Sequence, residues 1–232
     1  MKRILWIFLV WSLEFTTTIS FAATLATSHI SKLDISLETA GDPWKDSCSL
    51  DLVSKNPKGS AKISLKGKNS LCPLFGPVNL ITASSINHNS VIVIVQAAHG
   101  GDGEHTGPIL DVYSFSKNEF KKLGSQELFD ADYQRIDGAL ASVKGKVLFS
   151  FCDVCDGPDA ADPNDNIYVP ATLTFGCNGI CVKPQISKQE RNEIISLFNA
   201  AKSRAIKEKE NPELQSYVLR LEKSFNDFLQ RK

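Results

Sequence analysis

The residues best suited to chemistry lie in a glycine-rich segment, residues 99–107, which reads His-Gly-Gly-Asp-Gly-Glu-His-Thr-Gly. It combines two imidazoles with two carboxylates: His99, Asp102, Glu104 and His105. Both groups are ligands of zinc and other divalent ions, and glycine lets a backbone wrap closely around an ion. No recognised spacing such as His-Glu-x-x-His is present, and Gly-Asp-Gly is also an ordinary hairpin loop. We therefore expect a polar turn, with a divalent-metal site on these four residues as the alternative.

The six cysteines are the second chemical feature, and an even number in an exported chain predicts three disulfides. The first bridge that we predict joins Cys48 to Cys72, and closing a loop of about 25 residues removes roughly 3.5 kcal/mol of unfolded-state entropy on the chain-entropy model. Pairing of the others stays open between a local bridge and crossed bridges. A two-residue turn at 178–179 would put Cys177 and Cys181 on opposite faces, whereas a three-residue loop would place them opposite one another. The remaining cysteines are Cys152 and Cys155.

Cys152 and Cys155 follow an expected strand with two residues between them, and residues 169–172 read Val-Pro-Ala-Thr. Over about 60 residues this arrangement resembles the thiol oxidoreductases of the thioredoxin class, in which a proline segment faces such a pair. The resemblance implies thiol–disulfide exchange at the two cysteines. In that family the second cysteine lies in the first turn of a long helix, whereas here Gly157, Pro158 and Pro163 preclude such a helix. We therefore favour structural disulfides.

Short apolar or alternating runs bounded by turn residues predict a series of strands. The run at 91–98 is almost continuously apolar, which predicts a central strand buried on both faces. Regular spacing with hairpin-sized turns predicts a mainly β (α+β) fold built on an antiparallel meander, curled or sandwich-like. The other predicted strands are residues 33–37, 61–65, 109–116, 120–129, 146–151 and 167–175.

Near the C-terminus the spacing of apolar residues changes to that of a helix, and two amphipathic helices are expected there. Ser187 and Glu190 have the spacing of a capping box, and Asn211 with Pro212 provides a second helix start. We expect the apolar faces to pack on the sheet or on each other, and docking of a partner through the last helix is the alternative. The apolar positions are Ile194, Phe198, Ala201 and Ala205, then Leu214, Val218, Leu221, Phe225 and Phe228.

Residues 1–22 have the pattern of a secretory signal peptide: two basic residues, an apolar run at 4–13 and a small-residue site. A β domain at 23–186 and a helical pair at 187–232 would follow, in the periplasm or outside the cell, with no membrane span after cleavage. The chain has 26 basic and 26 acidic residues, so nothing drives it toward nucleic acid. We expect a binding or envelope-associated role without catalysis, toward an unidentified protein or small ligand.

Overall fold

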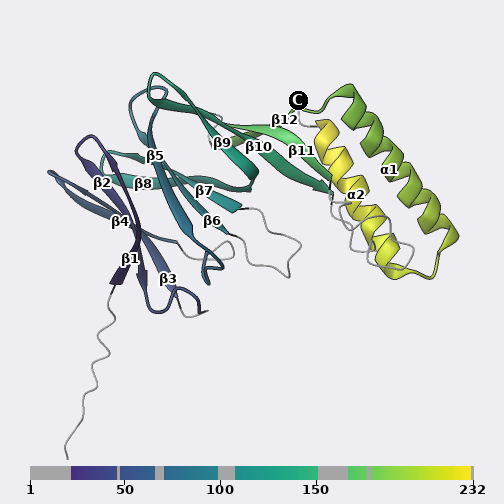
Figure 1. Ribbon diagram of the computed structural model, residues 1–232, viewed down its shortest axis with the longest axis horizontal. Helices are drawn as coiled ribbons and strands as arrows, with labels where there is room; N and C mark the ends of the chain where they lie inside the picture. The colour runs from purple at the N-terminus through teal and green to yellow at the C-terminus, as the bar shows by residue number, and fades with distance from the viewer. Residues whose placement is uncertain are drawn as a thin grey trace, which may run out of the picture.

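The computed structural model describes residues 22–45, 48–65, 71–98, 108–150, 167–176 and 179–230. Over these residues the chain forms twelve strands in two sheets, followed by two helices (Figure 1). The mainly β architecture with two C-terminal helices confirms the fold class predicted from the sequence.

Sheet A is a four-stranded antiparallel sheet with its strands in sequence order. Alternate side chains of the second and third strands point into one core, where Ile35, Leu37, Leu50 and Leu52 are fully buried. This period of two is what positions side chains on one face of a strand. The strands are β1 (Ala22–Ile30), β2 (Leu33–Ala40), β3 (Ser49–Asn56) and β4 (Gly59–Leu65).

Sheet B has eight strands in the order β12-β11-β10-β5-β6-β7-β8, with β9 paired to β10. Strand β10 meets β5 in a short parallel contact at residues 139 and 140 and then pairs with β11 from residue 142 onward. The sheet curls until its two edge strands, β8 and β12, approach each other. A Cβ added to Gly124 of β8 would lie only 3.1 Å from the side chain of Ile180 of β12. Its strands are β5 (Val78–Ser85), β6 (Val91–Ala98), β7 (Pro108–Ser116), β8 (Glu119–Glu127), β9 (Phe129–Ile136), β10 (Ala139–Ser150), β11 (Ile167–Phe175) and β12 (Ile180–Pro184).

Strand β6 separates two hydrophobic cores. Val93 and Val95 face the core shared with sheet A, whereas Ile92 and Ile94 belong to the core that includes β10, β11 and the helices. Figure 1 shows sheet A and the helical pair at opposite ends of the molecule, with sheet B between them. Burial of β6 on both faces confirms the prediction made from its continuous apolar run.

The two sheets approach each other along both edges of the sandwich. On one side β1 lies against β5, where the hydroxyls of Ser28 and Thr82 are 2.6 Å apart. On the other side β4 lies against β8, and Asn118 in the turn before β8 accepts from Asn56 at the end of β3 over 3.1 Å and donates to Ser60 O of β4 over 3.4 Å. The core of sheet A is therefore enclosed on its sides as well as by the two sheet faces.

Helices α1 (Lys188–Lys207) and α2 (Pro212–Gln230) begin at the caps expected from the sequence. Ser187 and Glu190 form a capping box, and Asn211 accepts from the backbone N–H of Leu214 over 3.1 Å. The apolar faces pack against each other and against sheet B, which is the expected use of the apolar stripe. Among the described residues, no helix is long and apolar enough to cross a membrane.

Several strand boundaries differ from the sequence prediction, most clearly in β8, β9 and β10. The run at 120–129 is not one strand, because the chain leaves β8 at Leu128 and starts β9 at Phe129. Leu128 is fully buried and its backbone N–H donates to Pro108 O over 3.1 Å, which ties the bend to the start of β7. Strand β10 begins at Ala139, before the predicted start at residue 146.

Candidate functional site

The glycine-rich segment connects neighbouring antiparallel strands. Ala98 at the end of β6 and Pro108 at the start of β7 are register partners, so residues 99–107 connect these two strands. The predicted ligands His99, Asp102, Glu104 and His105 lie outside the described residues, and the metal site stays a prediction. Within the described ranges, no three His, Cys, Asp or Glu side chains are grouped as a metal site would require.

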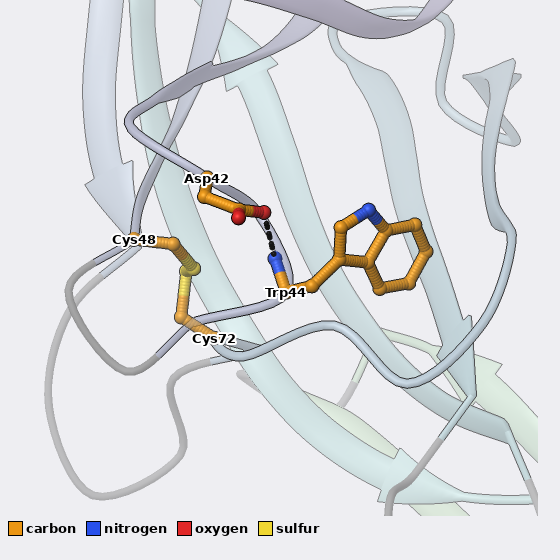
Figure 2. Close-up of a disulfide and its surroundings, with 4 residues drawn as sticks. All are labelled: Asp42, Trp44, Cys48 and Cys72. Atoms are coloured by element: carbon orange, nitrogen blue, oxygen red, sulfur yellow. Dashed lines mark hydrogen bonds between the residues drawn. A yellow bond between two sulfur atoms is a disulfide. The ribbon is translucent and has the colours of Figure 1, made fainter.

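The predicted bridge between Cys48 and Cys72 is present, with Cα atoms 5.9 Å apart (Figure 2). It ties the connection after β2 to the connection before β5. In the first of these, Asp42 Oδ1 accepts from the backbone N–H of Trp44 over 3.1 Å, and the Trp44 ring points away from the disulfide in Figure 2. The backbone N–H of Leu74 donates to Pro43 O over 2.8 Å, so a hydrogen bond joins the same two connections as the disulfide.

Cys181 is also in a disulfide, whereas Cys152, Cys155 and Cys177 lie outside the described residues. Cys181 pairs in register with Thr174, and Phe175 with Ile180. Four residues, 176–179, therefore connect β11 to β12, which is longer than either turn considered from the sequence. The pairing of Cys181 and any thiol–disulfide exchange at Cys152 and Cys155 stay predictions.

A cavity of about 790 Å³ opens at one end of the β sandwich. Four hairpin turns surround it, namely those joining β1 to β2, β3 to β4, β5 to β6 and β7 to β8. They contribute residues 30–33, 56–58, 84 with 88–91, and 115–118. Segments far apart in the sequence therefore form one concave site, which we call the hairpin-end pocket.

Apolar side chains line the inner wall of the hairpin-end pocket and polar side chains its rim. Phe115 is 7% exposed and packs in the core of sheet A, together with half-buried Leu33 and Val91. Exposed lysines come from three of the turns: Lys32, Lys58 and Lys117. An apolar wall with a few polar groups at the rim is the usual construction of a small-molecule site.

Backbone geometry at the turns holds the rim in place. Lys117 and Asn118 both have positive φ, 50° and 61°, as the two central residues of a tight hairpin turn require. The side chain of Asn118 accepts from Asn56 and donates to Ser60 O over 3.4 Å. Because Asn56 also accepts from the backbone N–H of Lys58 over 2.8 Å, one hydrogen-bonded chain ties two turns together.

No known family model, curated protein or solved structure matches this chain. Function is therefore inferred from the geometry of the described residues.

A cluster of hydrogen-bonded polar side chains surrounds the buried Asp111 inside the sandwich. Asp111 is 1% exposed and accepts from Tyr113 over 3.1 Å, from Lys122 over 3.0 Å and from Ser125. Burial, and then the Asp111 carboxylate, raise the pKa of Tyr113 far above its ordinary value, so the phenol stays a hydrogen-bond donor. Because its members satisfy one another, we assign the cluster a structural role.

Sequence reasoning did not find the hairpin-end pocket. Each turn taken alone carries an ordinary turn signal, for example Pro57 with Lys58 or Lys117 with Asn118. The four turns come to one end of the sandwich only because sheet A packs face to face with sheet B. The periodicity of residues along one strand does not predict how two sheets pack. The one feature of the sequence that could have indicated the pocket is the presence of a lysine in three of the four turns.

Proposed function

We propose that this chain is an exported binding protein, periplasmic or secreted, whose β sandwich holds a small ligand in the hairpin-end pocket. The observation that carries the proposal is the pocket itself. Its volume of about 790 Å³ lies within the roughly 300–1,000 Å³ typical of small-molecule sites.

Rigidity of the rim supports a binding role. Tight turns with left-handed residues have few alternative conformations, and the chain of hydrogen bonds through Asn56 and Asn118 fixes two of them relative to each other. A preformed site loses less conformational entropy when a ligand binds than a site that must be ordered first. A binding role needs only the shape and the polar groups that the pocket already has, and no catalytic side chain.

Disulfide chemistry supports export. Disulfides persist in oxidising compartments and are rare where glutathione keeps thiols reduced. The bridge between Cys48 and Cys72 and the bonded state of Cys181 are compatible with such a compartment. The signal-peptide pattern of residues 1–22 points the same way.

Blocking the pocket tests the proposal. Ser116 lines the pocket and is half-buried, so Ser116→Trp would place a large ring in the space that a ligand occupies. Ser203→Trp on the exposed face of α1 is the matched control. A library of small metabolites would be screened by thermal shift against the full chain and both variants.

We expect compounds that stabilise the unchanged chain and Ser203→Trp but not Ser116→Trp. A ligand at a hundred times its Kd should add about 2.7 kcal/mol to the free energy of unfolding. If no compound separates the two variants, the pocket is not the binding site and the proposal is refuted.

A further inference from the structure

We infer that the hairpin-end pocket selects small anions that carry an apolar body, such as an aryl or alkyl group with a carboxylate, sulfonate or phosphate. This inference rests on the proposed function, because it names the class of ligand for the same pocket. Two properties of the described lining residues carry it: the sign of the charge at the rim and the apolar character of the inner wall.

The charge at the rim has one sign. Lys32, Lys58 and Lys117 approach from three different turns. None of the described residues that line the pocket is an aspartate or a glutamate. Cations around a low-dielectric wall focus the electrostatic potential and raise the local concentration of anions.

The rim lysines have no acidic partner in the part of the chain that the structure describes. Elsewhere in the sandwich, Lys62 lies 2.7 Å from Asp51 and Lys122 lies 3.0 Å from Asp111. By contrast, Lys32, Lys58 and Lys117 make no ion pair with any described residue. Their ammonium groups remain available to an anionic ligand, which would supply the missing counter-charge.

The amides at the rim are largely committed to the fold. Asn56 and Asn118 use their side chains to join two turns. Because Phe115, Val91 and Leu33 form the wall, the rest of the ligand must be apolar to displace water from them favourably.

A matched pair of probes tests charge alone. Naphthalene carboxylate and naphthalene carboxamide have the same ring and nearly the same size, but only the first is an anion at neutral pH. Binding of each to the full chain would be measured by calorimetry, and the site located by amide chemical-shift changes in the labelled protein. Inorganic phosphate would serve as an anion without an apolar body, and naphthalene phosphate would compare the two headgroups.

We expect both naphthalene anions to shift amides of the four turns and to bind about tenfold more tightly than the carboxamide, with affinity falling as salt is added. Replacing all three rim lysines by glutamine should weaken the anions about tenfold and leave the carboxamide unchanged. The control replaces Lys144, Lys183 and Lys188, three exposed lysines outside the pocket, and should keep wild-type affinity.

The outcomes separate this inference from the proposed function. Equal binding of carboxylate and carboxamide at the four turns would overturn anion selection and leave the pocket as a binding site. Binding of inorganic phosphate as tight as that of naphthalene phosphate would overturn the need for an apolar body. A chain that binds none of the probes at millimolar concentration, or binds them away from the four turns, would overturn both.

Discussion

Replacing Lys122 by methionine should destabilise the sandwich more than replacing Asp111 by asparagine, although both changes break the same ion pair. The reason is the unequal burial of the two partners. The Asp111 side chain is 2% exposed, whereas that of Lys122 is 38% exposed. Without its cation the carboxylate stays buried and uncompensated, whereas a lysine without its carboxylate can turn into water.

The expected magnitudes follow from this asymmetry. Leaving a buried charge without its partner costs about 3–5 kcal/mol. Lys122 is partly exposed, and Tyr113 and Ser125 still donate hydrogen bonds to the carboxylate in its absence. We therefore expect Lys122→Met to lower the free energy of unfolding by about 3 kcal/mol, the low end of this range. Asp111→Asn loses a charged hydrogen bond, which costs about 1.5 kcal/mol. The double variant buries no charge, so we expect about 2 kcal/mol rather than the sum of about 4.5 kcal/mol.

Urea unfolding followed by circular dichroism, with disulfides intact, would give the free energy of unfolding of each variant. Lys121→Met is the control, because Lys121 is exposed on the same strand and makes no ion pair with a described residue; its effect should stay within about 0.5 kcal/mol. Additive single effects, or a larger loss in Asp111→Asn than in Lys122→Met, would refute the reasoning.

Four further outcomes are expected. Ser187→Ala should cost about 1 kcal/mol at neutral pH, and urea unfolding should show a smaller cost in acid. Hydrogen bonds from the Ser187 hydroxyl and then its backbone N–H lower the pKa of Glu190, so this contribution is present above the unfolded pKa and lost as pH falls through the folded one. Leu221→Ala, at a side chain 1% exposed, should cost about 3 kcal/mol in the same assay, whereas Leu219→Ala, 66% exposed, should stay within about 0.5 kcal/mol. Intact-mass measurement after alkylation without reduction should find no free thiol, and two labelled cysteines would favour a redox role. Elemental analysis of protein purified without chelator should find no stoichiometric zinc, copper or manganese, and about one ion per chain would favour a metal site in residues 99–107.

Elements with a strong local signal were predictable. Val91–Ala98 is apolar at nearly every position, and its bounds agree with β6. Both helices carry a cap with a known mechanism, Ser187 for the first and Asn211 for the second. The bridge between Cys48 and Cys72 was also predicted. For β6 and the helices, the deciding interactions lie close in sequence or follow from the side-chain period, whereas the bridge was predicted from cysteine number and order.

Strands that depend on distant partners were harder to predict. Strand β1 is rich in alanine and threonine and its sequence has no clear alternation of apolar and polar residues; its residues 23–30 are exposed or half-buried. It exists because β2 pairs along its whole length and β5 lies beside it. Strand β5 was missed as well, since its polar residues hide an alternation that only pairing with β6 makes apparent. The composition of a short segment cannot show that a neighbouring strand will stabilise it.

The hairpin-end pocket illustrates the same limit for function. Lys32, Lys58 and Lys117 are separated by long stretches of chain, and no spacing rule groups them. The chemistry that the sequence did single out, at residues 99–107 and at the later cysteines, depends on short motifs. Motif reasoning finds residues that are close in the chain, whereas this pocket exists only through the pairing of two sheets.

The position of β6 between two cores also constrains the order in which the chain can fold. Sheet A is complete in sequence by Leu65, but Leu37 and Leu50 share their hydrophobic core with Val93 and Tyr113, which follow later in the chain. During synthesis from the N-terminus, the first sheet therefore emerges with its apolar face bare. Its core is complete only once β6 and β7 have followed, so we expect the four N-terminal strands not to fold on their own, and a nascent chain stalled before β6 to be prone to aggregation.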